Sequence, residues 1–224
     1  GCNVTVPYKN DVIPYLAQID ELAAKMGSVN TLVRVDGGYK GYNTDMTGLY
    51  RAMSSDGVSI QGEQVIVLGA GGVGRAVAFM CAAKGAAHVW LLNRTVEKAA
   101  EVAKEVNLAE GRSCVEALAM SDYDKLPDEK YLVIQSTSVG LYPHVEDAVI
   151  TDPAFYHKVK AGYDLIYRPW ETRFMQLVKE QGAPAYNGLK MLLYQGIEAF
   201  ELWNQCKIED ESAYKLYEML RTTV

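Results

Sequence analysis

From residue 64 onward, short apolar runs alternate with longer segments in which apolar positions recur at helical spacing. The apolar runs predict strands at residues 65–68, 87–92, 131–135 and 161–166, with a further short strand near 113–115. The longer segments predict helices at residues 75–84, 95–106, 171–181, 189–205 and 211–221. Strands that alternate with helices pair in parallel through right-handed crossovers. This part of the chain therefore predicts an α/β fold with a Rossmann-type, doubly wound parallel sheet.

Residues 1–55 follow a different pattern, in which short strands and short helices are mixed. Alternation predicts a strand at residues 1–6, and Asp36-Gly37-Gly38 predicts a hairpin turn between two further strands, at 28–35 and 39–42. Short helices are expected at residues 10–16, 19–26 and 46–55. The first portion is therefore α+β in character.

A glycine-rich turn joins the strand at 65–68 to the Ala-rich helix that follows. Its sequence is Gly69-Ala70-Gly71-Gly72-Val73-Gly74, which contains G-x-G-x-x-G. A dinucleotide site needs these glycines for a tight turn, for close approach of the backbone to a pyrophosphate, and for helix–strand packing. The helix N-terminus adds unpaired N–H groups that attract phosphate. The alternative is a glycine-rich turn without a ligand, but the strand and the helix on either side favour nucleotide binding.

The end of the second strand of this sheet indicates which dinucleotide is bound. NAD sites usually place a carboxylate there, whereas the 2′-phosphate of NADP requires positive charge. Here the strand ends in Asn93-Arg94-Thr95, and Lys98 follows three residues later. These residues favour NADP, with Arg94 on the phosphate. The alternative is a solvated surface arginine beside a capped helix.

A polar loop, Ser136-Thr137-Ser138-Val139-Gly140, follows the strand at 131–135, on the sheet edge where ligands bind in open α/β folds. Ordinary turn chemistry explains this loop about as well as a binding role does. Lys9 and Asp45 each follow a predicted strand and each has hydrogen-bonding neighbours. A lysine beside a carboxylate can exchange a proton with an alcohol or a ketone during hydride transfer. Spacing alone does not separate this hypothesis from two solvated loop residues.

Composition narrows the classes of partner. The 224 residues carry a net charge of -6, which argues against nucleic acid or an anionic membrane as the main partner. No run of about 20 apolar residues predicts a membrane span, and the N-terminus lacks the pattern of a signal peptide. The four cysteines are scattered and predict free thiols in a reducing cytoplasm, with no metal site.

Seven motifs, in order along the chain, resemble those of the shikimate dehydrogenase family. The first, residues 1–9, reads Gly-Cys-Asn-Val-Thr-Val-Pro-Tyr-Lys and is similar to the family signature G-x-N-V-T-x-P-x-K. The others are Gly27–Leu32, Tyr42–Asp45, Gly69–Gly74, Asn93–Thr95, Asp164–Pro169 and Asn187–Gln195. This resemblance implies NADPH-dependent, reversible reduction of 3-dehydroshikimate to shikimate in aromatic amino-acid biosynthesis.

The resemblance also implies individual roles. Lys9 and Asp45 would be the catalytic pair, with Lys9 as proton donor and acceptor. The substrate would be bound by Asn3, Thr5, Asn30, Asp45, Tyr167 and Gln195, with Asn3 also supporting the loop of Lys9. NADP would be bound by Gly69, Ala70, Gly71, Gly72, Val73, Gly74, Asn93, Arg94, Thr95, Lys98, Thr137, Leu165 and Gly188. Residues 1–45 and 188–224 would form a partial substrate domain, and residues 46–187 the NADP-binding domain.

The chain departs from the family pattern at three places. Gln135-Ser136 stands where the family usually has Asn-Ala, and Lys190 stands where glycine is common. The chain also opens inside the first signature, without the family's N-terminal segment, which supplies strands and two substrate-binding serines. We therefore expect near-normal NADPH affinity, very weak or absent shikimate turnover, and self-association through an unpaired strand edge near Asn3.

Two other functions stay open on these grounds. One is a quinate/shikimate dehydrogenase of broader specificity, and the other is a non-catalytic NADP-binding module. A different Rossmann enzyme, such as a reductase of a tRNA-linked aldehyde, would need a reactive cysteine that nothing in the sequence supports. In each catalytic case the partner is a small molecule, and the chain is expected to be a monomer or a homodimer.

Overall fold

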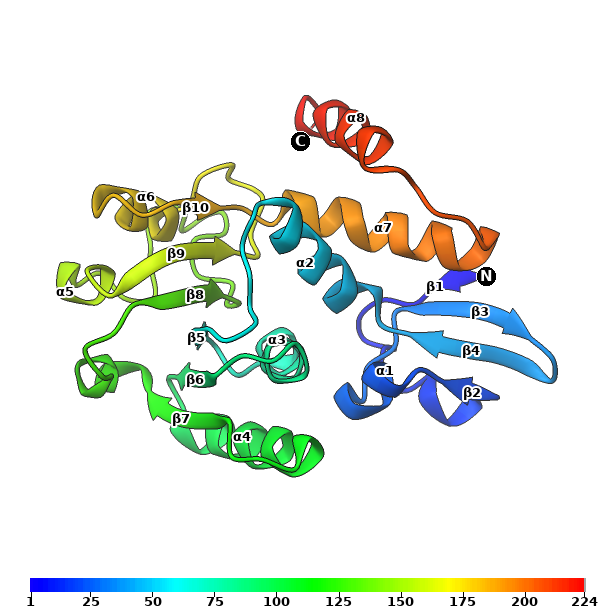
Figure 1. Cartoon of the computed structure of the whole chain (residues 1–224), viewed down its shortest axis with the longest axis horizontal. Coiled ribbons are helices and arrows are strands. Elements are labelled where there is room, and N and C mark those ends of the chain that lie inside the picture. Colours follow the sequence, from blue (N-terminus) through cyan, green and yellow to red (C-terminus); the bar gives the residue numbers. More distant parts are fainter. Residues whose placement is uncertain (224) are drawn as a thin grey trace. The chain divides into compact units, whose positions relative to one another are not determined.

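The structure, a computed structural model, describes residues 1–223. The chain forms two compact units, each with its own sheet (Figure 1). Unit 1 consists of Gly1–Gly57 and the chain from Leu189 onward, and unit 2 consists of Val58–Gly188. The first boundary was predicted after residue 45, but it lies after Gly57. The helix α2 (Thr44–Ser55) belongs to unit 1 because it packs along α7 (Leu189–Asn204).

Unit 2 contains a six-stranded sheet in which every pair of neighbours is parallel, in the order β10-β9-β8-β5-β6-β7. Its strands are β5 (Gln64–Leu68), β6 (His88–Asn93), β7 (Val115–Ala119), β8 (Tyr131–Gln135), β9 (Val159–Asp164) and β10 (Ala185–Tyr186). The order reverses between β5 and β8, the two central strands. The predicted doubly wound parallel sheet is confirmed.

Helices cover both faces of this sheet, which is why the central strands are continuous apolar runs (Figure 1). On one face α3 (Gly72–Ala83) packs on β5 and β6, and α4 (Val96–Glu110) packs on β6 and β7. On the other face α5 (Pro153–Tyr156) and α6 (Arg173–Glu180) contribute to a core with alternate residues of β5 and β8. Burial on both faces holds the carboxyl ends of β5 and β8 in register.

Unit 1 contains a four-stranded sheet in the order β1-β3-β4-β2. Its strands are β1 (Cys2–Asn3), β2 (Gln18–Ile19), β3 (Thr31–Val35) and β4 (Gly38–Tyr42). The predicted hairpin joins β3 to β4, and it turns at Gly37 and Gly38, whose φ values of +81° and +152° favour glycine. The helix α1 (Glu21–Met26) follows β2, and Asp20 caps it by accepting hydrogen bonds from the Leu22 and Ala23 amides.

The helices α2 and α7 approach closely at Gly48, where a Cβ atom would lie 2.5 Å from the Gln195 nitrogen. A side chain at this position would push the two helices apart. The last helix within residues 1–223 is α8 (Asp210–Arg221), which packs on α7. Arg51 on α2 links these helices, since its guanidinium bonds Glu198, the buried Glu201 and the backbone oxygen of Ile208.

Several short elements differ from the prediction. The strand expected at residues 1–6 covers only Cys2–Asn3, and the helix expected at 10–16 is a single 3-10 turn at Ile13–Tyr15. Pro14 lies in the first turn of that element and removes a backbone donor. The strands β2 and β10 were not predicted. A further 3-10 segment, Met120–Lys125, connects β7 to β8.

Within residues 1–223, no helix combines the length and apolar character that a membrane span requires. All four cysteines are free, and Cys81 and Cys114 are buried. Burial raises the pKa of the Cys81 thiol to about 12, so this thiol packs as an apolar group.

Candidate functional site

The glycine loop lies between β5 and α3, at the point where the strand order reverses. Gly69 has a φ of +102°, and a Cβ atom there would lie 2.7 Å from the Thr137 Cγ2 atom. A Cβ atom on Gly74 would overlap the backbone oxygen of Gly69. Gly71 and Gly72, by contrast, have no atom of the described residues within 4 Å of such a position. The loop is therefore tight on the protein side and open on the other, as a phosphate cradle requires.

The end of β6 lies beside this loop. The Asn93 Oδ1 atom accepts a hydrogen bond from the Ala70 amide at 3.1 Å, and its Nδ2 atom donates to the Thr95 oxygen at 2.8 Å. Asn93 therefore connects the glycine loop to the start of α4. Arg94, Thr95 and Lys98 are not buried, and within residues 1–223 the Arg94 and Lys98 side chains have no ion pair. These two cations remain available to a phosphate.

The polar loop after β8 is held in place by Gln135 and Ser136, the two residues that depart from the family pattern. The buried Gln135 side chain accepts a hydrogen bond from the Thr137 amide at 2.5 Å and donates to the Val139 oxygen at 3.2 Å. The Ser136 hydroxyl donates to the Leu68 oxygen at 2.7 Å. The substitutions thus tie the polar loop to β5 and place Thr137 against the glycine loop.

Asp164, at the end of β9, is completely buried beneath the same sheet edge. Burial raises the pKa of this carboxyl to about 6, even though three groups donate hydrogen bonds to it. These donors are the Thr172 hydroxyl at 2.6 Å, the Ile166 amide at 2.9 Å and the Gln135 amide at 3.4 Å. Asp164 therefore shapes the chain that leaves β9.

That chain carries Leu165 and Tyr167 and runs beside Gly188. A Cβ atom on Gly188 would overlap the Leu165 backbone oxygen, and the Gly188 amide donates to the Ile166 oxygen at 3.0 Å. Tyr167 is 36% exposed. The structure thus brings Leu165 and Gly188 together and leaves the Tyr167 side chain accessible.

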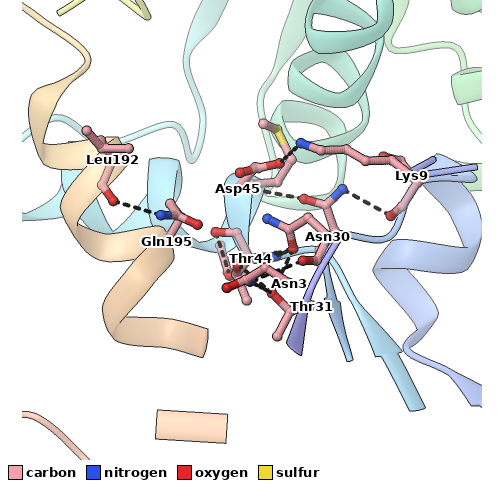
Figure 2. A network of polar contacts seen from close by, with 12 residues as sticks. Asn3, Lys9, Asn30, Thr31, Thr44, Asp45, Leu192 and Gln195 are labelled. Atoms are coloured by element: carbon pink, nitrogen blue, oxygen red, sulfur yellow. Dashed lines mark hydrogen bonds and ion pairs between the residues drawn. The ribbon is translucent and has the colours of Figure 1, made fainter. Parts of the chain in front are cut away.

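In unit 1, Lys9 and Asp45 form an ion pair with an Nζ–Oδ2 distance of 2.6 Å (Figure 2). Both side chains keep about a quarter of their surface exposed, 25% for Lys9 and 23% for Asp45. Asp45 lies in the first turn of α2, where the helix dipole favours a carboxylate. The Lys9 backbone is held in place because its oxygen accepts a hydrogen bond from the Val29 amide at 2.8 Å. An accessible ammonium therefore lies beside a fixed carboxylate.

Next to this pair, Asn30 sits in a buried polar network (Figure 2). Its Oδ1 atom accepts from the Thr44 amide at 2.8 Å and lies 3.0 Å from the Thr31 hydroxyl and 3.2 Å from the Thr44 hydroxyl. Asn43 caps α2 by accepting from the Met46 amide. The start of α2, and with it Asp45, is therefore bonded to β3 through Asn30.

The other predicted substrate residues of unit 1 differ in their exposure and in their hydrogen bonds. The Asn3 Nδ2 atom donates to the Asn30 backbone oxygen and to the Thr31 hydroxyl, both at 3.1 Å, so Asn3 supports the network around Asn30. Gln195 is half-buried on α7, and its Nε2 atom donates to the Leu192 oxygen (Figure 2). Thr5 is exposed, in the loop between β1 and the 3-10 turn.

The third departure from the family pattern, Lys190, also has a structural role. Its ammonium pairs with Asp56 and lies over the Tyr217 ring, 5.3 Å from the ring centroid. Lys190 therefore joins the end of α2, the start of α7 and α8, all within unit 1.

The site contacts of Thr31 and Thr44, and the bonds by which Gln135 holds the polar loop in place, were not predicted from the sequence. One signal for the threonines was present, because Asn-Thr occurs at the start of β3 and again at the start of α2. Gln135 carried no signal, since its partners are mainly backbone groups of the loop it precedes.

Three family models match parts of the chain. They are Shikimate / quinate 5-dehydrogenase over residues 52–150, the Shikimate dehydrogenase substrate binding domain over 1–32, and the Shikimate 5′-dehydrogenase C-terminal domain over 188–214. Among curated relatives, the shikimate dehydrogenase (NADP(+)) of Moorella thermoacetica is 40% identical over 205 residues, covering 91% of this chain and 69% of the relative. A Bacillus cereus enzyme of the same name is 40% identical over 210 residues, covering 91% and 72%.

Solved structures give the same result. A chorismate mutase/shikimate 5-dehydrogenase fusion protein from Clostridium acetobutylicum matches with a TM-score of 0.87 at 32% identity, covering 99% of this chain and 77% of that one. Shikimate 5-dehydrogenase from Thermus thermophilus, in complex with NADP(H) and shikimate, matches with a TM-score of 0.78 at 32% identity, covering 97% and 78%. The chain belongs to the shikimate dehydrogenase family.

Proposed function

We propose that this chain catalyses the NADP-dependent, reversible reduction of 3-dehydroshikimate to shikimate. The observation that carries the proposal is the accessible Lys9–Asp45 ion pair beside Asn30 in unit 1, in a chain whose unit 2 carries a dinucleotide loop. An oxidoreductase of this kind needs a dinucleotide site and a proton donor for the oxygen of the reacting carbon. The two units supply one each.

The residues of unit 2 fit NADP. Gly71 and Gly72 leave open space in front of the amides at the start of α3, which suits a pyrophosphate. Arg94 and Lys98 are accessible cations beside that loop and would pair with the 2′-phosphate. Thr95 adds a hydroxyl, while Leu165 and Gly188 would lie at the nicotinamide. The cofactor, when bound, supplies or accepts the hydride.

The proton chemistry belongs to unit 1. During reduction the ketone oxygen gains negative charge, and the Lys9 ammonium donates a proton to it. During oxidation the Lys9 amine takes the hydroxyl proton. Asp45 accepts a hydrogen bond from the Lys9 ammonium and holds it in position, and its second oxygen remains available to a substrate hydroxyl. Asn30 and Gln195 supply further polar contacts to the hydroxyl groups of the ring.

The test is a spectrophotometric assay of NADPH formation from NADP⁺ and shikimate. NAD⁺ replaces NADP⁺ in one control, and quinate replaces shikimate in another. Lys9→Met should lower kcat by about 10²–10⁴-fold, because it removes the general acid–base group. The KM for shikimate should change much less, since the lost interaction belongs mainly to the transition state. Lys215→Met is a matched control, because Lys215 is an exposed lysine of α8 paired with Glu211 along its own helix.

Each outcome of this assay decides between the hypotheses. NADPH formation that depends on shikimate supports the proposal and would contradict the expectation of very weak or absent turnover, and equal turnover of quinate would broaden the substrate range. Tight NADPH binding with no turnover of either substrate would reject the proposal in favour of an NADP-binding module. A Lys9→Met variant that keeps kcat and loses only KM would make Lys9 a binding residue.

A further inference from the structure

Asn30 has only one of its two amide atoms available to a ligand. Its Oδ1 atom faces three donors, namely the Thr44 amide and the hydroxyls of Thr31 and Thr44. Its Nδ2 atom has no hydrogen bond within residues 1–223, and it does not belong to the fully buried polar atoms that lack a partner. The oxygen is therefore engaged inside the protein, while the nitrogen of this 4% exposed residue has no partner within residues 1–223 and is not fully buried.

The Thr44 backbone amide restricts which way round the Asn30 side-chain amide can lie. A backbone N–H can only donate, so the Thr44 amide at 2.8 Å requires an acceptor opposite it. A flipped Asn30 side chain would place its NH₂ group against that N–H and leave two donors facing each other. Such an unpaired buried donor costs about 1–3 kcal/mol. Asn30 consequently offers a donor, and not an acceptor, to any ligand.

The two threonine hydroxyls complete the same arrangement. Thr31 Oγ1 accepts from Asn3 Nδ2 at 3.1 Å and lies 3.0 Å from Thr44 Oγ1. A carbonyl oxygen has two lone pairs, and the Thr44 amide occupies one at Asn30 Oδ1. The other lone pair therefore accepts one hydroxyl hydrogen, and the second hydroxyl donates to the first. Either direction of this relay ends on Asn30 Oδ1, and loss of either hydroxyl reduces the relay to a single hydrogen bond.

We propose that Thr31 and Thr44 are positioning residues, which hold the Asn30 amide so that its Nδ2 atom donates to a hydroxyl oxygen of the substrate. Thr31 is completely buried and Thr44 is 1% exposed, so both act through Asn30 rather than by contact. The same bonds join β3 to the first turn of α2, which carries Asp45. The substrate in this proposal is the one given under the proposed function, on which this inference rests.

The kinetic test compares Thr31→Val and Thr44→Val with the serine variants at the same positions. Valine removes the hydroxyl and keeps the β-branched shape, whereas serine keeps the hydroxyl. Each valine variant should lower kcat/KM for shikimate by about fivefold, the equivalent of one hydrogen bond, mainly through KM. The serine variants should remain within about twofold of the parent, and the affinity for NADP⁺ should stay unchanged.

A double-mutant cycle separates positioning from general loss of structure. In an Asn30→Ala background, Thr31→Val should cause no further loss of kcat/KM, because the group it positions is already gone. Ser55→Ala is a matched control, since it removes a hydroxyl at the far end of α2 that bonds the Ala52 oxygen of its own helix. Additive losses in the cycle would overturn the proposal.

A binding-independent measurement keeps the inference separate from the proposed function. In isotope-labelled protein, the side-chain NH₂ resonances of Asn30 are assigned by their loss in Asn30→Ala. The valine variants should shift and broaden these resonances, and the serine variants and Ser55→Ala should leave them in place. If the parent chain turns over no shikimate, the proposed function fails while this measurement still decides the positioning role. Unchanged Asn30 resonances in both valine variants would refute it.

Discussion

Replacing Asp164 with asparagine should flatten part of the pH dependence of stability. Burial raises the pKa of this carboxyl from 3.8 to about 6 in the folded chain. Between these values the folded state keeps the proton and the unfolded state releases it. Stability therefore falls as the pH rises from about 4 to about 6, and is constant above that range. A difference of roughly two pKa units corresponds to about 3 kcal/mol.

The variant Asp164→Asn is neutral at every pH and nearly identical in size. Its Oδ1 atom can still accept from the Ile166 amide, while its NH₂ group faces the Thr172 hydroxyl oxygen. The free energy of unfolding of the parent should drop by about 3 kcal/mol between about pH 4 and pH 6.5 relative to that of the variant. Above that range the difference between the two proteins should no longer depend on pH.

Urea unfolding at several pH values, followed by tryptophan fluorescence, measures this difference. Subtracting variant from parent removes the contributions of all other carboxylates. Asp152→Asn is a control of opposite sign, because hydrogen bonds from the Tyr123 hydroxyl and the Ala154 amide lower the pKa of that exposed carboxyl. The contribution of Asp152 to stability is fully present above the usual pKa of a carboxyl and is lost as the pH falls through the lowered pKa. Equal slopes for the parent and Asp164→Asn between about pH 4 and pH 6.5 would refute the reasoning.

Three further predictions use other contacts. Arg94→Ala should weaken NADPH binding by roughly ten- to a hundredfold and NADH binding much less, as measured by fluorescence titration; equal losses would return Arg94 to a surface role. Gly74→Ala should cost about 1–3 kcal/mol in thermal unfolding, because its Cβ atom overlaps the glycine loop, whereas Gly72→Ala meets no atom of the described residues and should be tolerated. Glu201→Ala should destabilise the fold by about 1–3 kcal/mol, since Arg51 loses its buried carboxylate but keeps Glu198 and the Ile208 oxygen, and a midpoint equal to that of the parent in urea would contradict this.

The sequence predicted unit 2 well because its strands are buried on both faces. β5 and β8 are continuous apolar runs that depend little on distant contacts, and β8 begins and ends at the predicted residues. β2 and β10 have two residues each, too few for any alternation to be visible. The boundary after Gly57 was also hidden, because the assignment of α2 depends on packing against α7, which lies far along the chain.

The residues of the candidate site carried a sequence signal, whereas most of the bonds between them did not. Lys9 and Asp45 lie 36 residues apart, and their pairing was suggested only by their positions after strands and by the family motifs. Those motifs place each residue type but not the bonds that orient it. The relay through Thr31 and Thr44 requires β3 and α2 to meet, so no local pattern could reveal it.

A perturbed pKa in this chain does not by itself identify the proton donor. Asp164 has the feature often used to find catalytic carboxyls, since its pKa of about 6 lies within the range of general acids and bases. Yet this side chain is completely buried, and both of its oxygens accept hydrogen bonds from protein groups. Such a carboxyl cannot exchange a proton with a substrate. The Lys9 ammonium keeps a quarter of its surface exposed and has a fixed partner in Asp45, which are the two properties that proton transfer requires. Accessibility therefore favours Lys9 over Asp164 for the proposed acid–base role, and this proposal predicts that Asp164→Asn changes stability while leaving the Lys9-dependent step in place.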